Sequence, residues 1–156
     1  MYVAVVGPGE ATEEQLTAAE EVGARLASRG AVVVTGGLGG VMEAASRGAA
    51  QAGGRAVGLL PGLERAEANP WVTIALPTGL GELRNGLVVR AADAVIAIGG
   101  AYGTLSEVAL ALKAGKPVVG VGTWAIEGVL AVAGAEEAVE RALAAFGQRC
   151  AWPQRP

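Results

Sequence analysis

The stretch Ile96-Ala97-Ile98-Gly99-Gly100-Ala101-Tyr102-Gly103-Thr104-Leu105-Ser106-Glu107 decides the fold of this chain. It begins inside an apolar run, residues 94–98, which has the length of a buried parallel strand. A glycine-rich turn follows, and then an apolar helix that reaches about Lys113. The first N–H groups of a helix have no partners within it and carry partial positive charge, and glycine lets an anion approach the backbone. The stretch therefore predicts a phosphate-binding turn with a carboxylate beside it, formed by Gly99, Gly100, Ala101, Tyr102, Gly103, Thr104 and Glu107.

Composition limits the chemistry that this chain can perform. The 156 residues carry a net charge of −3, contain no histidine and include one cysteine. Histidine triads, cysteine zinc clusters and internal disulfides are therefore excluded, and the acidic balance argues against nucleic-acid binding. We expect a soluble cytoplasmic protein without a membrane segment, a metal or a resident cofactor. One domain, residues 1–146, is expected to precede a tail, residues 147–156.

Apolar strands alternate with helical segments along the whole chain. The expected strands are 2–7, 31–35, 55–60, 71–76, 93–98, 118–121 and 129–132. The expected helices are 12–28, 41–52, 81–92, the one that ends near Lys113, and 135–146. In the helix 81–92, one face is expected to carry Leu83, Leu87, Val88 and Ala91. The pattern predicts the α/β class: a single doubly wound, Rossmann-like parallel sheet with helices on both faces.

Three glycine turns follow strands and should therefore meet at one edge of the sheet. They are Gly7–Gly9, Gly36–Gly40 and Gly99–Gly103. Ligands of such sheets bind beyond the carboxyl ends of the strands. The first two turns and the helix after the second add these candidate ligand residues: Gly7, Pro8, Gly36, Gly37, Gly39, Gly40 and Met42.

Two common nucleotide motifs do not fit these turns. Gly7-Pro8-Gly9 begins a dinucleotide motif, but Thr12 stands at its third glycine and Thr35 stands where an acidic residue should hold the ribose. No glycine turn is followed by the Lys-Ser or Lys-Thr pair of a Walker A loop. NAD and a P-loop site are therefore not expected.

Several segments resemble the Lonely guy (LOG) family, long called lysine decarboxylases. They are 36–43, 58–61, Arg84, 92–96 and the glycine turn 99–107, and the resemblance spans about residues 1–123. Two positions depart from the family pattern. Its proline before the glycines is Ile98 or Gly99 here, and the lysine after its arginine is Asn85. These departures and the Gly-Pro-Gly start are more similar to a short branch that includes the molybdenum cofactor carrier proteins.

The resemblance implies two alternative functions. The first is a phosphoribohydrolase that cleaves the N-glycosidic bond of nucleoside 5′-monophosphates, with Glu107 stabilising an oxocarbenium-like state and Arg84 binding phosphate or positioning substrate. The second is a non-catalytic carrier or sensor of a phosphorylated pterin, such as the molybdenum cofactor. The resemblance also implies a homodimer.

Purely structural roles are open for the same residues. Thr104-Leu105-Ser106-Glu107 fits a capping box, in which Glu107 would only satisfy a backbone N–H. The turn 36–40 could serve close packing of helix on strand, and Tyr102 could pack on a neighbouring helix instead of a ligand.

Overall fold

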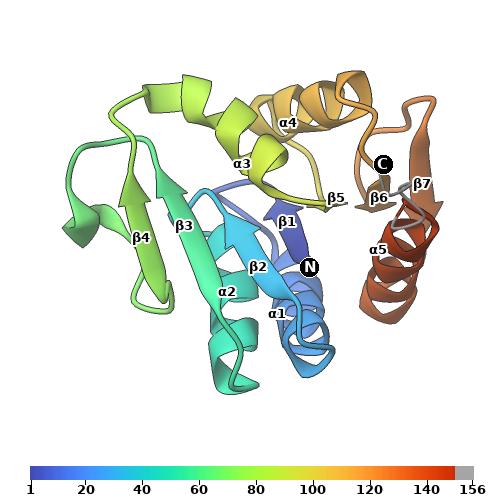
Figure 1. Ribbon diagram of the computed structural model, residues 1–156, viewed down its shortest axis with the longest axis horizontal. Helices are drawn as coiled ribbons and strands as arrows, with labels where there is room; N and C mark the ends of the chain where they lie inside the picture. The colour runs from blue at the N-terminus through green and yellow to red at the C-terminus, as the bar shows by residue number, and fades with distance from the viewer. Residues whose placement is uncertain (150–156) are drawn as a thin grey trace, which may run out of the picture.

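A seven-stranded parallel sheet runs through the molecule with a layer of helices on each side (Figure 1). The computed structural model describes residues 1–149. The strands are β1 (Tyr2–Val6), β2 (Val32–Thr35), β3 (Ala56–Leu60), β4 (Ile74–Pro77), β5 (Ala94–Ile98), β6 (Val118–Val121) and β7 (Val129–Val132). The helices are α1 (Glu13–Ser28), α2 (Val41–Gln51), α3 (Asn85–Ala91), α4 (Tyr102–Lys113) and α5 (Ala135–Arg149), with 3-10 turns η1 (Arg65–Glu67) and η2 (Gly81–Arg84). This architecture confirms the predicted fold class.

The central strand β1 is buried on both faces, which explains its unbroken apolar sequence. Val3 and Val5 face a core made with α1, α2 and α5. Ala4 and Val6 face a second core made with α3 and α4. Successive side chains of a strand point to opposite faces, so β1 holds the two helix layers to the same sheet.

The strand order places a switch point beside β1. The order is β4-β3-β2-β1-β5-β6-β7, so the chain leaves β1 toward one edge and returns to its other side with β5. The three glycine turns follow β2, β1 and β5, which are neighbours in the sheet. The predicted meeting of these turns at one carboxyl edge is therefore confirmed, and it falls where doubly wound sheets bind ligands.

Strand β4 begins later than the sequence predicts. The sequence pattern starts it at Trp71, but the segment before Ile74 is a turn closed on Asn69. The Asn69 side-chain oxygen accepts a hydrogen bond from the Trp71 N–H at 3.1 Å, and the Asn69 carbonyl accepts one from Val72 at 3.2 Å. These bonds use the backbone groups that a strand would need.

The expected helix 81–92 is divided into η2 and α3, and of the four residues predicted for its inward face only Val88 is buried. Leu83 is 81% exposed and Leu87 is 41% exposed, whereas Arg84 and Val88 are buried. The 3-10 turn has about three residues per turn, so it changes the phase at which side chains meet the sheet. The inward positions therefore fall one residue later than the sequence pattern indicates, and this brings Arg84 inside.

The carboxyl-terminal helix continues beyond the end expected from the sequence. Helix α5 runs to Arg149, so the first part of the expected tail 147–156 is helical. The remainder of that tail, with Cys150, lies outside the described residues. Across the described part of the chain, every helix is too short or too polar to cross a bilayer.

Candidate functional site

A cleft of about 850 Å³ opens at the carboxyl edge of the sheet. Its walls come from the turn after β1, the start of α2, the segment from η2 into α3, and the first turns of α4. Nine of the residues predicted for the site line it: Gly7, Pro8, Met42, Arg84, Ala101, Tyr102, Gly103, Thr104 and Glu107. The fold thus brings together residues that lie up to 100 positions apart in the sequence.

The helices that begin at this edge differ in how their first N–H groups are satisfied. The start of helix α1 is capped by a capping box of Thr12 and Gln15. The first N–H of α2, from Val41, donates to the Pro8 carbonyl at 3.1 Å. Helix α4 has no side-chain cap, and within residues 1–149 no carbonyl of another element accepts from its first three N–H groups. The start of α4 is therefore open to an anion.

Thr104 contributes a buried hydroxyl to the open start of α4. The residue is 2% exposed, and its Oγ1 has no hydrogen-bond partner among the described residues. It lies inside the helix, because Ala101 is the N-cap residue. The capping-box interpretation of Thr104 and Glu107 is therefore wrong. An unpaired buried hydroxyl is costly, and a ligand oxygen in the cleft would supply the missing partner.

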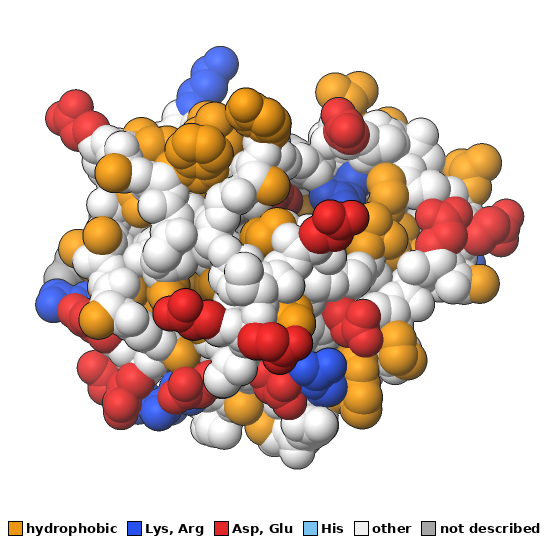
Figure 2. All heavy atoms as spheres, turned by 180° about the vertical axis from the view of Figure 1, so that it is seen from behind, with side chains coloured by type: hydrophobic (Ala, Val, Ile, Leu, Met, Phe, Trp, Pro, Cys, Tyr) orange, Lys and Arg blue, Asp and Glu red, His pale blue; other side chains and the backbone are white. Residues whose placement is uncertain are grey.

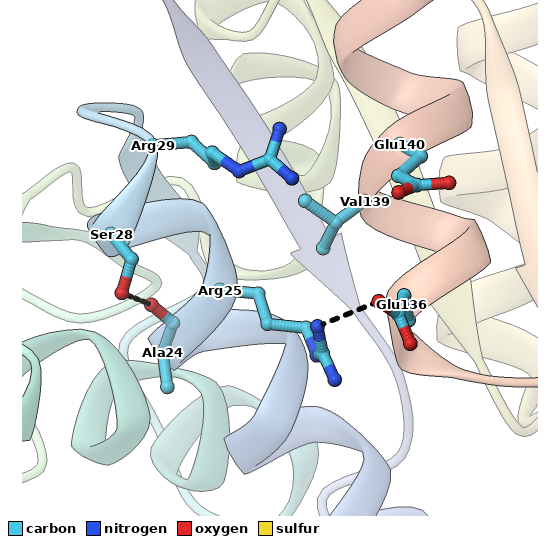
Figure 3. A pocket seen from close by; sticks show the side chains of 7 residues that line it. All are labelled: Ala24, Arg25, Ser28, Arg29, Glu136, Val139 and Glu140. Carbon is cyan, nitrogen blue, oxygen red and sulfur yellow. Dashed lines mark hydrogen bonds and ion pairs between the residues drawn. The ribbon is translucent and has the colours of Figure 1, made fainter.

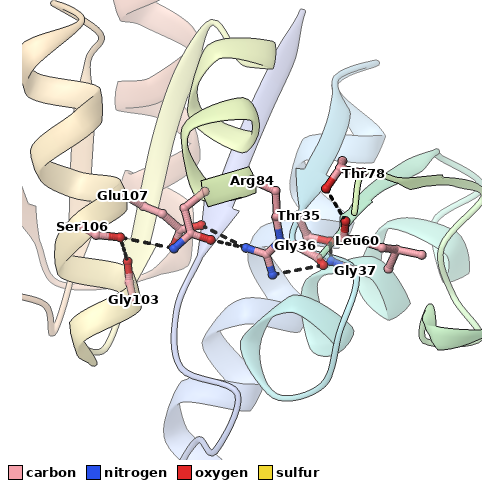
Figure 4. A network of polar contacts seen from close by, with 10 residues as sticks. Thr35, Gly36, Gly37, Leu60, Thr78, Arg84, Gly103, Ser106 and Glu107 are labelled. Atoms are coloured by element: carbon pink, nitrogen blue, oxygen red, sulfur yellow. Dashed lines mark hydrogen bonds and ion pairs between the residues drawn. The ribbon is translucent and has the colours of Figure 1, made fainter. Parts of the chain in front are cut away.

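Arg84 brings a buried positive charge to the cleft. It is 7% exposed, and its Nη2 donates to the Gly36 carbonyl at 3.4 Å (Figure 4). A Cβ on Gly36 would lie 2.5 Å from Nη2, so the glycine makes room for the guanidinium. The Arg84 Nε has no partner among the described residues. Burial lowers the pKa of Arg84, and the negative charge of Glu107 opposes this shift. The guanidinium nevertheless remains a cation.

Glu107 faces Arg84 from α4, with its Oε1 4.0 Å from Arg84 Nη1. Burial raises the pKa of Glu107 to about 7, and the nearby Arg84 charge only partly offsets this effect. Glu107 is 6% exposed, and its carboxyl accepts no hydrogen bond that would cap the start of α4. It can therefore exist near neutral pH with or without its proton, which is a property of groups that act as acids or bases.

Sequence reasoning missed three polar residues of the cleft, the exposed Glu82 and the hydrogen-bonded pair of Asn85 and Ser106. Asn85 Oδ1 accepts a hydrogen bond from Arg84 Nη1, and Asn85 Nδ2 donates to Ser106 Oγ at 3.2 Å. Ser106 Oγ donates in turn to the Gly103 carbonyl at 2.7 Å. Both residues adjoin predicted site residues in the sequence, but no local motif indicates that they meet across 21 positions.

The remaining predicted glycines do not line the cleft. They are Gly36, Gly37, Gly39, Gly40, Gly99 and Gly100. A Cβ on Gly40 would lie 2.3 Å from the Gly9 carbonyl oxygen, and one on Gly100 would lie 2.9 Å from the Trp124 side chain. Gly40 and Gly100 therefore allow close packing of the chain on itself, and contact of any of the six glycines with a ligand stays a prediction.

A second hollow of about 250 Å³ lies between α1 and α5 (Figure 3). Its Arg25 is already paired: Arg25 Nη1 lies 3.4 Å from Glu136, which also lines the hollow, and Arg25 Nε lies 2.8 Å from the neighbouring Glu21. Acidic side chains are also spread widely over the face seen in Figure 2, as expected from the net charge of −3. The cleft, with its unpaired buried donors, is therefore the stronger candidate for an anionic ligand.

Comparison with known proteins finds a family and a relative that each match most of the chain. The profile of the SLOG cluster4 family matches residues 1–145. An uncharacterised protein of Archaeoglobus fulgidus is 43% identical over 140 residues, which cover 89% of this chain and 92% of that protein.

Two solved structures share both the fold and much of the sequence. The molybdenum cofactor binding protein of Rippkaea orientalis superposes with a TM-score of 0.87 at 39% identity, covering 92% of this chain and 95% of that one. The molybdenum cofactor carrier protein of Chlamydomonas reinhardtii gives a TM-score of 0.85 at 35% identity, covering 94% and 98%. The chain belongs to the SLOG cluster4 family.

Proposed function

We propose that this SLOG-family chain is a carrier that binds a phosphorylated pterin of the molybdenum cofactor type in the cleft. The proposal is supported by the two relatives of known ligand, each matched over more than nine-tenths of this chain. The residues of the cleft fit such a cargo, because its phosphate can accept hydrogen bonds and its ring system needs a partly apolar wall. The cleft volume of about 850 Å³ lies within the usual range for small-molecule sites.

The phosphate is assigned to the amino end of α4. The observation that carries this assignment is the buried Thr104 hydroxyl, which has no partner among the described residues and adjoins an uncapped helix start. Three kinds of donor would serve the phosphate: the first N–H groups of α4, the Thr104 hydroxyl and the Arg84 guanidinium. Leu38, Met42 and Pro61 offer apolar surface for the rest of the ligand.

A titration with a pterin that carries a terminal phosphate monoester tests this function. The same pterin after phosphatase treatment is the control ligand, and we expect it to bind at least about 100-fold more weakly, because the charge-assisted bonds are lost. Thr104→Val removes one donor and should weaken binding of the phosphorylated pterin about tenfold.

Thr123→Val is the matched control variant. Thr123 also has a buried hydroxyl without a partner in the described chain, but it does not line the cleft. It should bind the phosphorylated pterin like the wild type. Equal affinity for both forms of the pterin would contradict the assignment of the phosphate, and absence of binding by either form would reject the carrier function.

Glu107 favours hydrolysis of nucleoside 5′-monophosphates as a second candidate function. A buried carboxyl with a pKa of about 7, beside an arginine in a cleft, has the properties of a group that stabilises an oxocarbenium-like state or directs water. Incubation with AMP, GMP, CMP and UMP, followed by chromatography for free base, tests this candidate. Release by the wild type and not by Glu107→Gln would support it, and no release from any of the four would reject it.

The homodimer implied by the family resemblance stays a prediction. A candidate surface for it is the apolar rim of the cleft, which exposes Leu83, Tyr102 and Leu110. Exposed apolar side chains grouped in this way are typical of contact surfaces. Sedimentation of the wild type and of Leu83→Ser, with a lower mass expected for the variant, tests this surface.

A further inference from the structure

Arg84 is held by neutral groups although a carboxyl group lies beside it. Its Nη1 donates to the Asn85 side chain and its Nη2 donates to the Gly36 carbonyl. The Glu107 Oε1 lies 4.0 Å from Nη1, which is beyond hydrogen-bond distance. Buried arginine and carboxylate groups normally form short, often bidentate pairs. The Asn85 side chain therefore occupies a donor that Glu107 could otherwise use.

The other end of the Asn85 amide is fixed to α4. Asn85 Nδ2 donates to Ser106 Oγ, and Ser106 donates to the carbonyl of Gly103 in the first turn. Figure 4 shows this path from Gly103 and Ser106 across the cleft to Arg84 and Gly36. The position of the guanidinium is thus coupled to the helix start at which the phosphate is assigned.

We propose that Asn85 is a positioning residue that holds the Arg84 guanidinium away from Glu107 and available to the phosphate at the start of α4. The ligand part of this inference rests on the proposed function. The geometric part does not, because the state of Glu107 can be measured in the protein without ligand.

The electrostatic surroundings of Glu107 make it a direct reporter of this geometry. Arg84 is the charged group that acts on its pKa, which burial raises to about 7. Glu82 and Tyr102, the other titratable side chains lining the cleft in the described structure, are both exposed. If Asn85 no longer holds Arg84, the guanidinium can close on Glu107, and the pKa of that carboxyl should fall.

The first experiment follows the Glu107 carboxyl by ¹³C NMR during a pH titration without ligand. We expect Asn85→Leu, which keeps the size of the side chain and removes its polar atoms, to lower the pKa of Glu107 by about one unit or more. Asn85→Ala should lower the pKa of Glu107 in the same way, and it replaces Asn85→Leu in this test if that variant does not fold. A pKa within about half a unit of the wild type in a folded Asn85 variant would overturn the proposal.

Two controls separate positioning from general loosening. Asn69→Leu removes an amide that donates to the Gly37 and Leu38 carbonyls and has no hydrogen bond to Arg84. It should lower the melting temperature and leave the pKa of Glu107 unchanged. Ser106→Ala removes the bonds of Ser106 to Asn85 and to the Gly103 carbonyl but leaves the bond between Asn85 and Arg84, so it should shift that pKa less than Asn85→Leu. A shift in Asn69→Leu as large as in Asn85→Leu would contradict a specific role.

The second experiment compares the affinity for the phosphorylated pterin at about pH 8 and about pH 5. Asn85→Leu should bind about tenfold more weakly than the wild type at the higher pH, because ionised Glu107 competes for Arg84. The loss should be smaller at the lower pH, where Glu107 is protonated. The phosphate itself also titrates near pH 6, so variant and wild type are compared at each pH.

The two failures can be told apart. A wild type that binds no phosphorylated pterin rejects the proposed function, while the NMR titration still decides the role of Asn85. A wild type that binds the pterin, with an Asn85→Leu variant that matches it in affinity and in the pKa of Glu107, rejects the role of Asn85 alone.

Discussion

The glycine turns after β1 and β2 differ from the turn after β5 in what completes them. The first two turns are completed by the chain itself: the Pro8 carbonyl accepts from Val41, and Gly40 packs against the backbone of Gly9. The third leads to the uncapped start of α4 and a buried Thr104 hydroxyl without a partner among the described residues. A glycine-rich turn can therefore serve either close packing of the chain or binding of an anion. Hydrogen-bond donors without a partner show which turn is the candidate anion site.

The largest expected effect is loss of stability in Gly40→Ala. Gly40 has a φ of 64°, and a Cβ there would lie 2.3–2.6 Å from backbone atoms of Pro8 and Gly9. The strained backbone and the clash should together cost about 3 kcal/mol or more of unfolding free energy. Urea denaturation of wild type and variant measures this loss.

Gly103→Ala is the matched substitution at the uncapped start of α4, after β5. The nearest atom to its added Cβ would be Asn85 Nδ2 at 4.0 Å, so the fold has room for it. Stability should stay equal or rise by about 0.5–1 kcal/mol, since alanine is favoured in helices. The methyl group lies in the cleft, so the phosphorylated pterin should bind more weakly. A Gly103→Ala variant as unstable as Gly40→Ala would remove the distinction between the two turns.

Glu107 provides the next largest effect, and it depends on pH. Its pKa is about 7 in the folded protein and near its ordinary value of 4.5 when unfolded. A raised folded pKa stabilises the fold below pH 4.5, and this contribution is lost as pH rises through about 7. Glu107→Gln cannot ionise, so above pH 7 it should be more stable than the wild type by about 3 kcal/mol.

Thermal unfolding at several pH values checks this expectation. The wild type should lose stability between about pH 5 and pH 8 relative to Glu107→Gln, and the two should converge at the acidic end. If the stability of the two proteins changed with pH in parallel over this range, Glu107 would be ionised in the folded state throughout it. Burial would then not raise the pKa of Glu107.

The sequence is sufficient for the parts of the molecule that local patterns specify. Apolar runs such as 94–98 and the capping box of Thr12 predict the sheet and the helix starts, because strand burial and capping depend on neighbouring residues. The cleft residues Arg84, Thr104 and Glu107 lie together as expected. Thr104 and Glu107 follow from the edge at which parallel strands end, whereas Arg84 is expected there only from the resemblance to the LOG family.

The polar contacts inside the cleft could not be predicted in the same way. Arg84 turns inward because η2 changes the helical phase by one residue, which the apolar pattern of Leu83 and Leu87 conceals. Asn85 meets Ser106 only because α3 and α4 pack side by side. Glu107 fits a local capping box as well as a site, and only the observed N-cap at Ala101 decides against the cap.

The smallest expected effect comes from Ala101→Asp, which would cap the start of α4 with a carboxylate of the chain itself. Ala101 already has the extended backbone of an N-cap residue, with φ of −139° and ψ of 170°. An aspartate there can accept from the first N–H groups of α4 and should stabilise the fold by about 1 kcal/mol. The same carboxylate would compete with the ligand phosphate, so affinity for the phosphorylated pterin should fall as stability rises.

Ala101→Asn separates capping from charge. Asparagine caps a helix about as well as aspartate and is neutral, so it should stabilise the fold by a similar amount, about 1 kcal/mol, with a smaller loss of affinity. Melting temperatures and pterin titrations of the two variants measure both effects. If Ala101→Asp gains stability and binds the phosphorylated pterin as tightly as the wild type, the phosphate does not lie at α4, and the uncapped helix start after β5 is not the ligand's anion site.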